Sequence, residues 1–183
     1  MRSRVFAGAA AGIGLAVGIL LSPIGGAFAG HTNKILQADL DGRQEVKTGA
    51  TNKAIVGDPS GRGEAYVFGI DGDPKTFCYV LTVDKIALAE PGMSAHIHKG
   101  AAGANGPVVA NLARPFDGDA ADCLTEGEIL PNGASAFPTG EKVADILANP
   151  SAYYVNVHNP DCPGGAIRGQ LRGRWQAAGR RSR

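Results

Sequence analysis

Apolar and polar residues alternate along several short segments of this 183-residue chain, and a period of two is typical of β-strands. The alternation is clear in 34–42 and on both sides of the turn-forming residues in 61–86, which predicts a hairpin there. Two further strand pairs are predicted in 93–112 and 152–173, each around a Gly-rich turn. Short strands with turns at regular spacing predict an all-β fold, an antiparallel sandwich or barrel.

One segment has a helical period instead. In 139–150, Val143, Ile146 and Leu147 share one face, Thr139 is placed to cap the helix, and Pro150 is placed to end it. We expect this short helix to pack over one end of the sandwich. The segment 113–138, rich in Gly, Asp and Pro, is expected to be the least regular part of the fold.

The first 29 residues differ from the rest of the chain. Arg2 and Arg4 precede an apolar stretch over 5–21, and a small-residue cleavage motif ends at Ala29. These features predict a cleaved signal peptide over 1–29 and a protein that is secreted or associated with the cell envelope. A retained membrane anchor is the alternative, although the stretch is short and rich in Gly and Ala for a membrane span.

Removing the leader takes away two arginines and no acids, which lowers the formal net charge from +1 to −1. The rest is long enough for one domain, which we assign to 34–174, between a flexible 30–33 and a flexible basic tail over 175–183. This balanced charge does not favour binding to nucleic acid, and no stable membrane insertion is expected after cleavage.

Three cysteines follow the leader, and disulfides persist in an exported protein. One disulfide and one remaining thiol is therefore the default interpretation. We favour a Cys78–Cys123 pair, with Cys78 in a predicted central strand. Cys162 would then be the remaining thiol, and its alternatives are a disulfide partner or a metal ligand.

Period-two geometry sorts the side chains of three predicted strands into two faces. The apolar set is expected to face the core: Ala95, Ile97, Tyr153, Val155, Val157, Ile167 and Leu171. The outer face then carries the polar set: His96, His98, Tyr154, Asn156, His158, Arg168 and Gln170. We expect this polar set to lie on the water side of the sandwich or beneath a loop.

Three histidines of the outer face converge if their strands are neighbours: His96, His98 and His158. Three imidazoles suit copper or zinc, and ring nitrogens within about 4 Å of one another are compatible with one ion. Alternatively, the histidines are solvated or hydrogen-bonded, with Asn156 and His158 tying the 101–105 turn to the closing hairpin. Arg168 on the same face would either steer an anion to a metal or repel the cation.

Two blocks, HIHKGAAGANGPVVANL at 96–112 and YYVNVHNPDCPGGAIRGQL at 153–171, resemble the signature blocks of the CHRD domain family, which is widespread in exported bacterial proteins. The resemblance runs from about Lys34 to Arg174. It implies an antiparallel Greek-key, immunoglobulin-like β-sandwich with limited similarity to copper/zinc superoxide dismutase. The family has no settled activity, and its place in chordin, an extracellular antagonist, implies binding or scaffolding.

The similarity to superoxide dismutase extends to single residues. His96 and His98 resemble its HxH copper pair, His158 resembles a later copper histidine, and Arg168 lies loosely where a substrate-steering arginine would. A bridging histidine and a zinc loop are missing, since His31 lies upstream of the pattern. The resemblance thus implies at most a mononuclear site with copper or zinc.

The leading expectation is a non-enzymatic extracellular binding or scaffold module for a protein or a glycan, without a certain cofactor. The alternative is a mononuclear copper- or zinc-binding protein, for which weak dismutase-like redox activity is the one enzymatic option. No catalytic triad order, phosphate loop or zinc-protease helix occurs in the sequence.

Overall fold

A computed structural model describes residues 35–47 and 54–173. Within these residues the chain forms nine strands, one α-helix and two short 3-10 helices. The elements are β1 (Ile35–Asp41), η1 (Gly42–Gln44), β2 (Arg62–Ile70), β3 (Asp73–Asp84), β4 (Ser94–Lys99), β5 (Val108–Leu112), β6 (Asp119–Thr125), α1 (Val143–Ala148), η2 (Pro150–Ala152), β7 (Tyr153–His158), β8 (Ile167–Gln170) and β9 (Arg172–Gly173).

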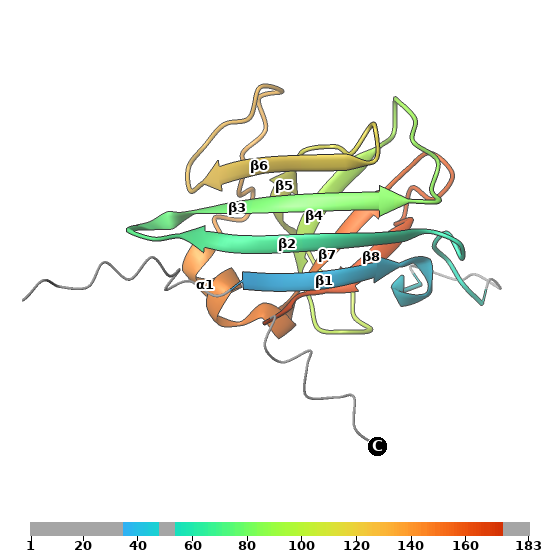
Figure 1. Ribbon diagram of the computed structural model, residues 1–183, viewed down its shortest axis with the longest axis horizontal. Helices are drawn as coiled ribbons and strands as arrows, with labels where there is room; N and C mark the ends of the chain where they lie inside the picture. The colour runs from blue at the N-terminus through green and yellow to red at the C-terminus, as the bar shows by residue number, and fades with distance from the viewer. Residues whose placement is uncertain (1–34, 48–53, 174–183) are drawn as a thin grey trace, which may run out of the picture. The chain divides into compact units, whose positions relative to one another are not determined.

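The strands form one continuous antiparallel path in the order β5-β4-β7-β8-β1-β2-β3-β6, and β9 pairs with β1. In Figure 1, β1, β2, β3 and β6 run side by side across the front, and β4, β5, β7 and β8 cross behind them. The layers join where β1 pairs with β8 at Asp41 and Arg168 and with β9 at two further positions. The links from β3 to β4 and from β5 to β6 pass between layers, as in a Greek key. The expected all-β antiparallel sandwich is confirmed.

All three strand pairs that the sequence predicts are present. β2 pairs with β3, β4 with β5, and β7 with β8, each antiparallel. The core lies between the layers and takes alternate residues of each strand, as the period of two requires. The inward set of β4, β7 and β8 is the expected one, and its members are all at most 1% exposed: Ala95, Ile97, Tyr153, Val155, Val157 and Ile167.

The helix packs as expected but begins later. Val143 and Ile146 are fully buried, and α1 contacts β2 and β3. The predicted cap at Thr139 is wrong, because Gly140 adopts a φ of +69° that ends helical geometry between Thr139 and Val143. The first helical amide is instead satisfied from a distant segment, since Val143 N–H donates to Glu126 Oε1 at 3.0 Å.

The segment 113–138 is more regular than its composition predicts, because it contains β6. This strand pairs with β3 over seven residues and places Cys123 opposite Cys78. The two cysteines form a disulfide, as expected. Ala120 and Leu124 are the inward residues of β6, while the strand's remaining positions are exposed and largely polar. Because β6 has only two inward apolar residues, its alternation is too weak to predict a strand from the sequence.

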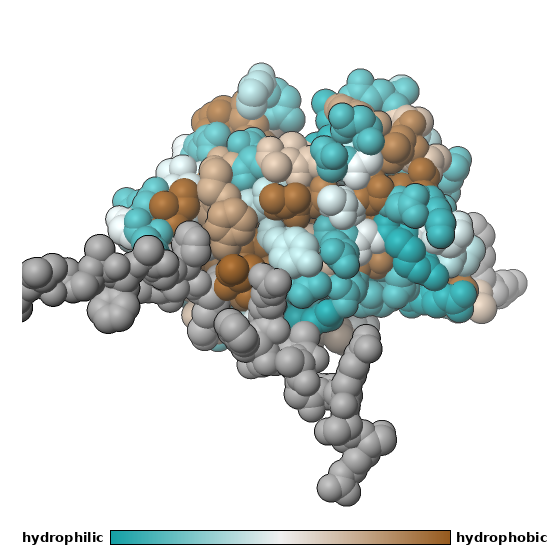
Figure 2. Space-filling model, in the orientation of Figure 1, coloured by the Kyte–Doolittle hydropathy of each residue, from teal (hydrophilic) through white to brown (hydrophobic). Residues whose placement is uncertain are grey.

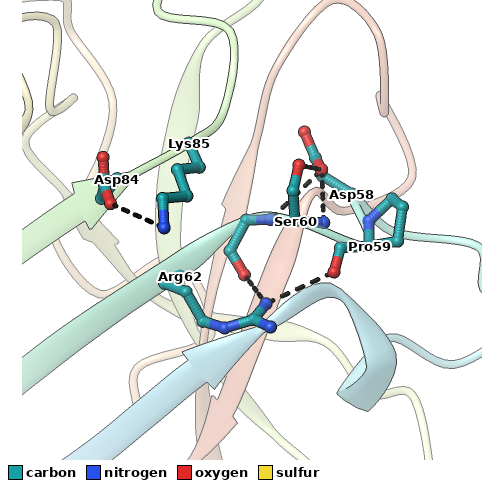
Figure 3. Close-up of polar contacts among 7 residues, drawn as sticks. Asp58, Pro59, Ser60, Arg62, Asp84 and Lys85 are labelled. Carbon is teal, nitrogen blue, oxygen red and sulfur yellow. Dashed lines mark hydrogen bonds and ion pairs between the residues drawn. The ribbon is translucent and has the colours of Figure 1, made fainter.

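The turn that precedes β2 is closed by its own side chains (Figure 3). Asp58 Oδ1 accepts hydrogen bonds from Ser60 Oγ at 2.7 Å and from the Ser60 amide at 2.9 Å, which lower the pKa of Asp58. Arg62 donates to the carbonyls of Pro59 and Gly61. Asp58 N–H also donates to the Ala166 carbonyl at 2.8 Å, so this turn is attached to the β7–β8 hairpin.

The outer surface of the front layer is mixed in character. Figure 2 shows brown apolar residues interspersed with teal polar ones, as expected for strands with one face in water. The described part of the chain contains no helix long and apolar enough to span a membrane. The predicted signal peptide over 1–29, the 30–33 segment, His31 and the 175–183 tail lie outside the described residues.

Candidate metal centre

Three histidines meet on the outer face of the back layer because β4 and β7 are neighbours. In their register His96 lies opposite Asn156, and His158 lies opposite Ser94. His158 is therefore the diagonal neighbour of His96, while His98 lies one pleat further along β4. The ring centroids are 5.2 Å apart for His96 and His158, 5.6 Å for His96 and His98, and 6.1 Å for His98 and His158.

One ring nitrogen from each histidine can serve a common ion. The candidate ligand atoms lie within 4.8 Å of one another. Zinc–nitrogen bonds near 2.0–2.1 Å place two ligand nitrogens of one ion about 3.3–3.6 Å apart. The cluster is thus wider than the 4 Å expected of a site, and the three nitrogens would have to move closer together to hold one ion.

The hydrogen bonds of two histidines fix which nitrogen faces the cluster. His98 Nδ1 lies 2.9 Å from the Gly106 carbonyl oxygen, and His158 Nδ1 lies 3.1 Å from that of Pro163. A carbonyl oxygen only accepts, so in both neutral rings Nδ1 carries the proton and Nε2 keeps its lone pair. A histidine that binds a metal through one ring nitrogen usually donates a hydrogen bond from the other, as these two rings do.

One nitrogen of each histidine ring is buried without a hydrogen-bond partner among the described residues. His96 Nδ1, His98 Nε2 and His158 Nε2 have no hydrogen-bond partner among the described residues. Buried polar atoms without a partner are uncommon in folded proteins and require an explanation. Three of them in one cluster, one from each ring, fit a trio of metal ligands.

The cluster also favours neutral imidazoles. Burial, together with repulsion from His158 and His98, lowers the pKa of His96 to about 4. Burial likewise lowers the pKa of His98 and of His158. All three rings are therefore uncharged near pH 7, which is the state that binds a metal.

The polar face is covered by loops. His98 is 9% exposed, Asn156 is 4% and Arg168 is 2%, while His96 and His158 are half-buried. Of the two positions expected for this outer face, the one beneath a loop therefore describes it better than the solvated one. The 100–107 turn covers His98 through Gly106, and the 159–165 turn covers His158 through Pro163. Beside His96, a cleft of about 670 Å³ is lined by Ser94, Asn111 and Arg114 among others.

Arg168 is held in place by this loop cover. Its guanidinium donates to the carbonyls of Ala101 and Ala104 and to Asn105 Oδ1. It also lies 3.4 Å from the ring centroid of Tyr154. The 100–107 turn is thus tied down by Arg168, and not by Asn156 and His158 as one interpretation of the sequence had it.

Glu45 is a half-buried acidic residue that no sequence pattern singled out. Asn156 Nδ2 donates to Glu45 Oε2 at 3.5 Å, and Glu45 Oε1 is buried without a partner among the described residues. Burial raises the pKa of Glu45 to about 7, against the attraction of Arg168. Gln170, the other outer-face residue, donates to the carbonyls of Gly100, Ser151 and Tyr153. Cys162 is not part of the histidine cluster.

Comparison with protein families gives one result. The family model of the CHRD domain matches residues 36–171. The chain belongs to the CHRD domain family. In this CHRD domain the matched residues include the three clustered histidines, together with Asn156, Arg168 and Gln170.

No curated protein and no solved structure matches this chain. The resemblance of the CHRD domain to superoxide dismutase therefore stays an expectation.

Gly106 is expected to be intolerant of a side chain. A Cβ atom at this position would lie 1.7 Å from the Lys99 carbonyl oxygen, so the backbone that holds His98 would have to move. Gly103→Ala is the comparison: its Cβ would meet nothing within 4 Å, and the positive φ alone costs about 1–2 kcal/mol. We expect Gly106→Ala to lower the free energy of unfolding by about 2 kcal/mol more than Gly103→Ala does. Urea unfolding of both variants measures the difference, and equal losses would contradict this account.

Glu45 is expected to make stability depend on pH. The pKa of Glu45 is about 7 in the folded domain and near 4.5 when the side chain is exposed. Its contribution to the free energy of unfolding is therefore fully present below pH 4.5 and is lost as the pH rises through 7. Each pKa unit is worth about 1.4 kcal/mol, which limits the loss to about 3 kcal/mol.

The Glu45→Gln variant removes this titration. Its free energy of unfolding, relative to that of the natural domain, is expected to rise between pH 4.5 and pH 7.5. Urea unfolding with a chelator present measures it. The lowered histidine pKa values act in the opposite direction in both proteins and cancel in the difference. A difference that does not change with pH would contradict the raised pKa.

Proposed function

We propose that this chain is an extracellular, mononuclear metal-binding CHRD protein that holds copper or zinc through His96, His98 and His158. The observation that carries the proposal is the trio of buried nitrogens without partners, Nδ1 of His96 and Nε2 of His98 and His158. Imidazole nitrogen is a preferred ligand of both metals, and three protein ligands leave a position open. When bound, the ion would supply Lewis acidity or, as copper, one-electron chemistry.

The surroundings of the histidines support binding. Carbonyl groups orient two of the three rings, and burial keeps all three neutral. The cleft beside His96 would be the route by which a small molecule approaches this position. An export route agrees with the Cys78–Cys123 disulfide, since disulfides persist in oxidising compartments.

Metal analysis of the full chain tests the proposal. Protein purified without chelators from the compartment that receives it is expected to contain about one copper or zinc ion per chain. For the copper form, electron paramagnetic resonance is expected to show coupling to imidazole nitrogen. Protein that retains neither ion after dialysis would overturn the proposal. The expected non-enzymatic role in binding an extracellular protein or glycan would then be the function to pursue.

A further inference from the structure

Arg168 is a buried cation whose hydrogen bonds all go to one turn. The Nη2 group donates to the Ala104 carbonyl at 2.7 Å and to the Ala101 carbonyl at 3.1 Å, and Nη1 donates to Asn105 Oδ1 at 3.2 Å. Arg168 is almost completely buried, at 2% exposure. It is therefore unsuited to steering an anion from outside, the role that the dismutase similarity implied.

The turn held by Arg168 carries the group that orients His98. Gly106 directly follows the Ala104 and Asn105 contacts, and its carbonyl oxygen lies 2.9 Å from His98 Nδ1. The amide of the same residue donates to the Tyr154 hydroxyl at 3.3 Å. Both polar groups of Gly106 are thus used to hold the turn against the histidine face.

Arg168 is also connected to His98 through the ring of Tyr154. The His98 ring is stacked on the Tyr154 ring, with centroids 4.8 Å apart and planes 7° from parallel. The guanidinium of Arg168 lies 3.4 Å from the Tyr154 centroid. Arg168 therefore contacts both elements that constrain the His98 ring, the turn and the tyrosine.

We propose that Arg168 is the positioning residue of the metal centre: by fixing the 100–107 turn, it places the Gly106 carbonyl on His98 Nδ1 and so presents Nε2 to the ion. Without that carbonyl, a neutral imidazole exchanges its proton between the two nitrogens, and part of the population carries a proton at the ligand atom. The effect on metal affinity depends on the proposed function, whereas the effect on the His98 tautomer does not.

The tautomer can be measured in the metal-free full chain by long-range ¹H–¹⁵N NMR of ¹⁵N-labelled histidines. In the natural protein, His98 and His158 are both expected in the Nδ1–H form. In Arg168→Gln, we expect a mixture of tautomers at His98, while His158 keeps the Nδ1–H form because its partner is the Pro163 carbonyl. Zn²⁺ affinity is expected to fall about 10–100-fold, as for other partners of metal ligands.

Two further variants keep the test decisive. Arg172→Gln is the matched control, because Arg172 pairs with the exposed Asp39, and it is expected to change neither the tautomer nor the affinity. Asn105→Ala removes one hydrogen-bond acceptor of Arg168 and leaves the buried cation in place. This variant therefore tests the positioning role if Arg168→Gln does not fold. A smaller shift toward mixed tautomers at His98 would support the proposal.

An unchanged His98 in a folded Arg168→Gln variant, or in Asn105→Ala if the former does not fold, would overturn it. If the natural protein binds no metal but its His98 tautomer responds to Arg168, the proposed function fails and the positioning role stands.

Discussion

Replacing His158 with alanine is expected to weaken Zn²⁺ binding by about a thousandfold. Loss of an outer partner of a ligand typically costs 10–100-fold, and loss of a direct ligand costs more. The metal-free protein should lose only about 1–2 kcal/mol of stability, the value of one or two hydrogen bonds, because the ring donates to the Pro163 carbonyl. Competition with a chromophoric chelator measures the affinity, and urea unfolding measures the stability.

The two outcomes separate a metal ligand from a hydrogen-bonding residue. His31→Ala is the matched control, because it removes the histidine that lies outside the described cluster, and its Zn²⁺ affinity is expected to equal that of the natural protein. If His158→Ala loses stability but binds Zn²⁺ as before, the ring acts only as a hydrogen-bond donor.

Removing the disulfide is expected to cost about 4 kcal/mol of unfolding free energy. Cys78 and Cys123 are separated by 45 positions, and the loss of chain entropy for a loop of that size gives this magnitude. The cost should be high in this protein because β6 is an edge strand with two inward apolar residues. The Cys78→Ala/Cys123→Ala double variant tests it by urea unfolding.

Cys162→Ala is the matched control for this experiment, since it removes a cysteine and leaves the disulfide intact. Its loss of stability should be much smaller than that of the double variant. A double variant as stable as the natural protein would show that the pairing of β6 with β3 is sufficient without the bridge.

Local alternation was enough to predict much of this fold. The three hairpins, the inward residues of β4 and β7 and the common face of the histidines all follow from a period of two. The pairing of β4 with β7 does not follow from this period, because the paired residues are distant in the sequence. The meeting of His158 with His96 was therefore a hypothesis until the strand order was known.

Features set by tertiary contacts were missed or placed wrongly. The helix begins at Val143 because Gly140 interrupts helical geometry before it, and the Val143 amide donates a hydrogen bond to Glu126 of another segment. Alternation left two positions open for the polar face, in water or beneath a loop, and the contact of Arg168 with the 100–107 turn decides between them. Glu45 lies outside any periodic element, so nothing in the sequence marked it as half-buried with a raised pKa.

The strand order has a consequence for when the chain can acquire an ion. His98 and His158 are 60 positions apart, and β5, β6 and α1 lie between them in the chain. A nascent or unfolded chain therefore offers a two-histidine chelate, and the third ligand arrives only when the back layer has assembled. High-affinity loading of the proposed ion is thus expected to follow folding, and a bound ion would stabilise the assembled back layer by mass action.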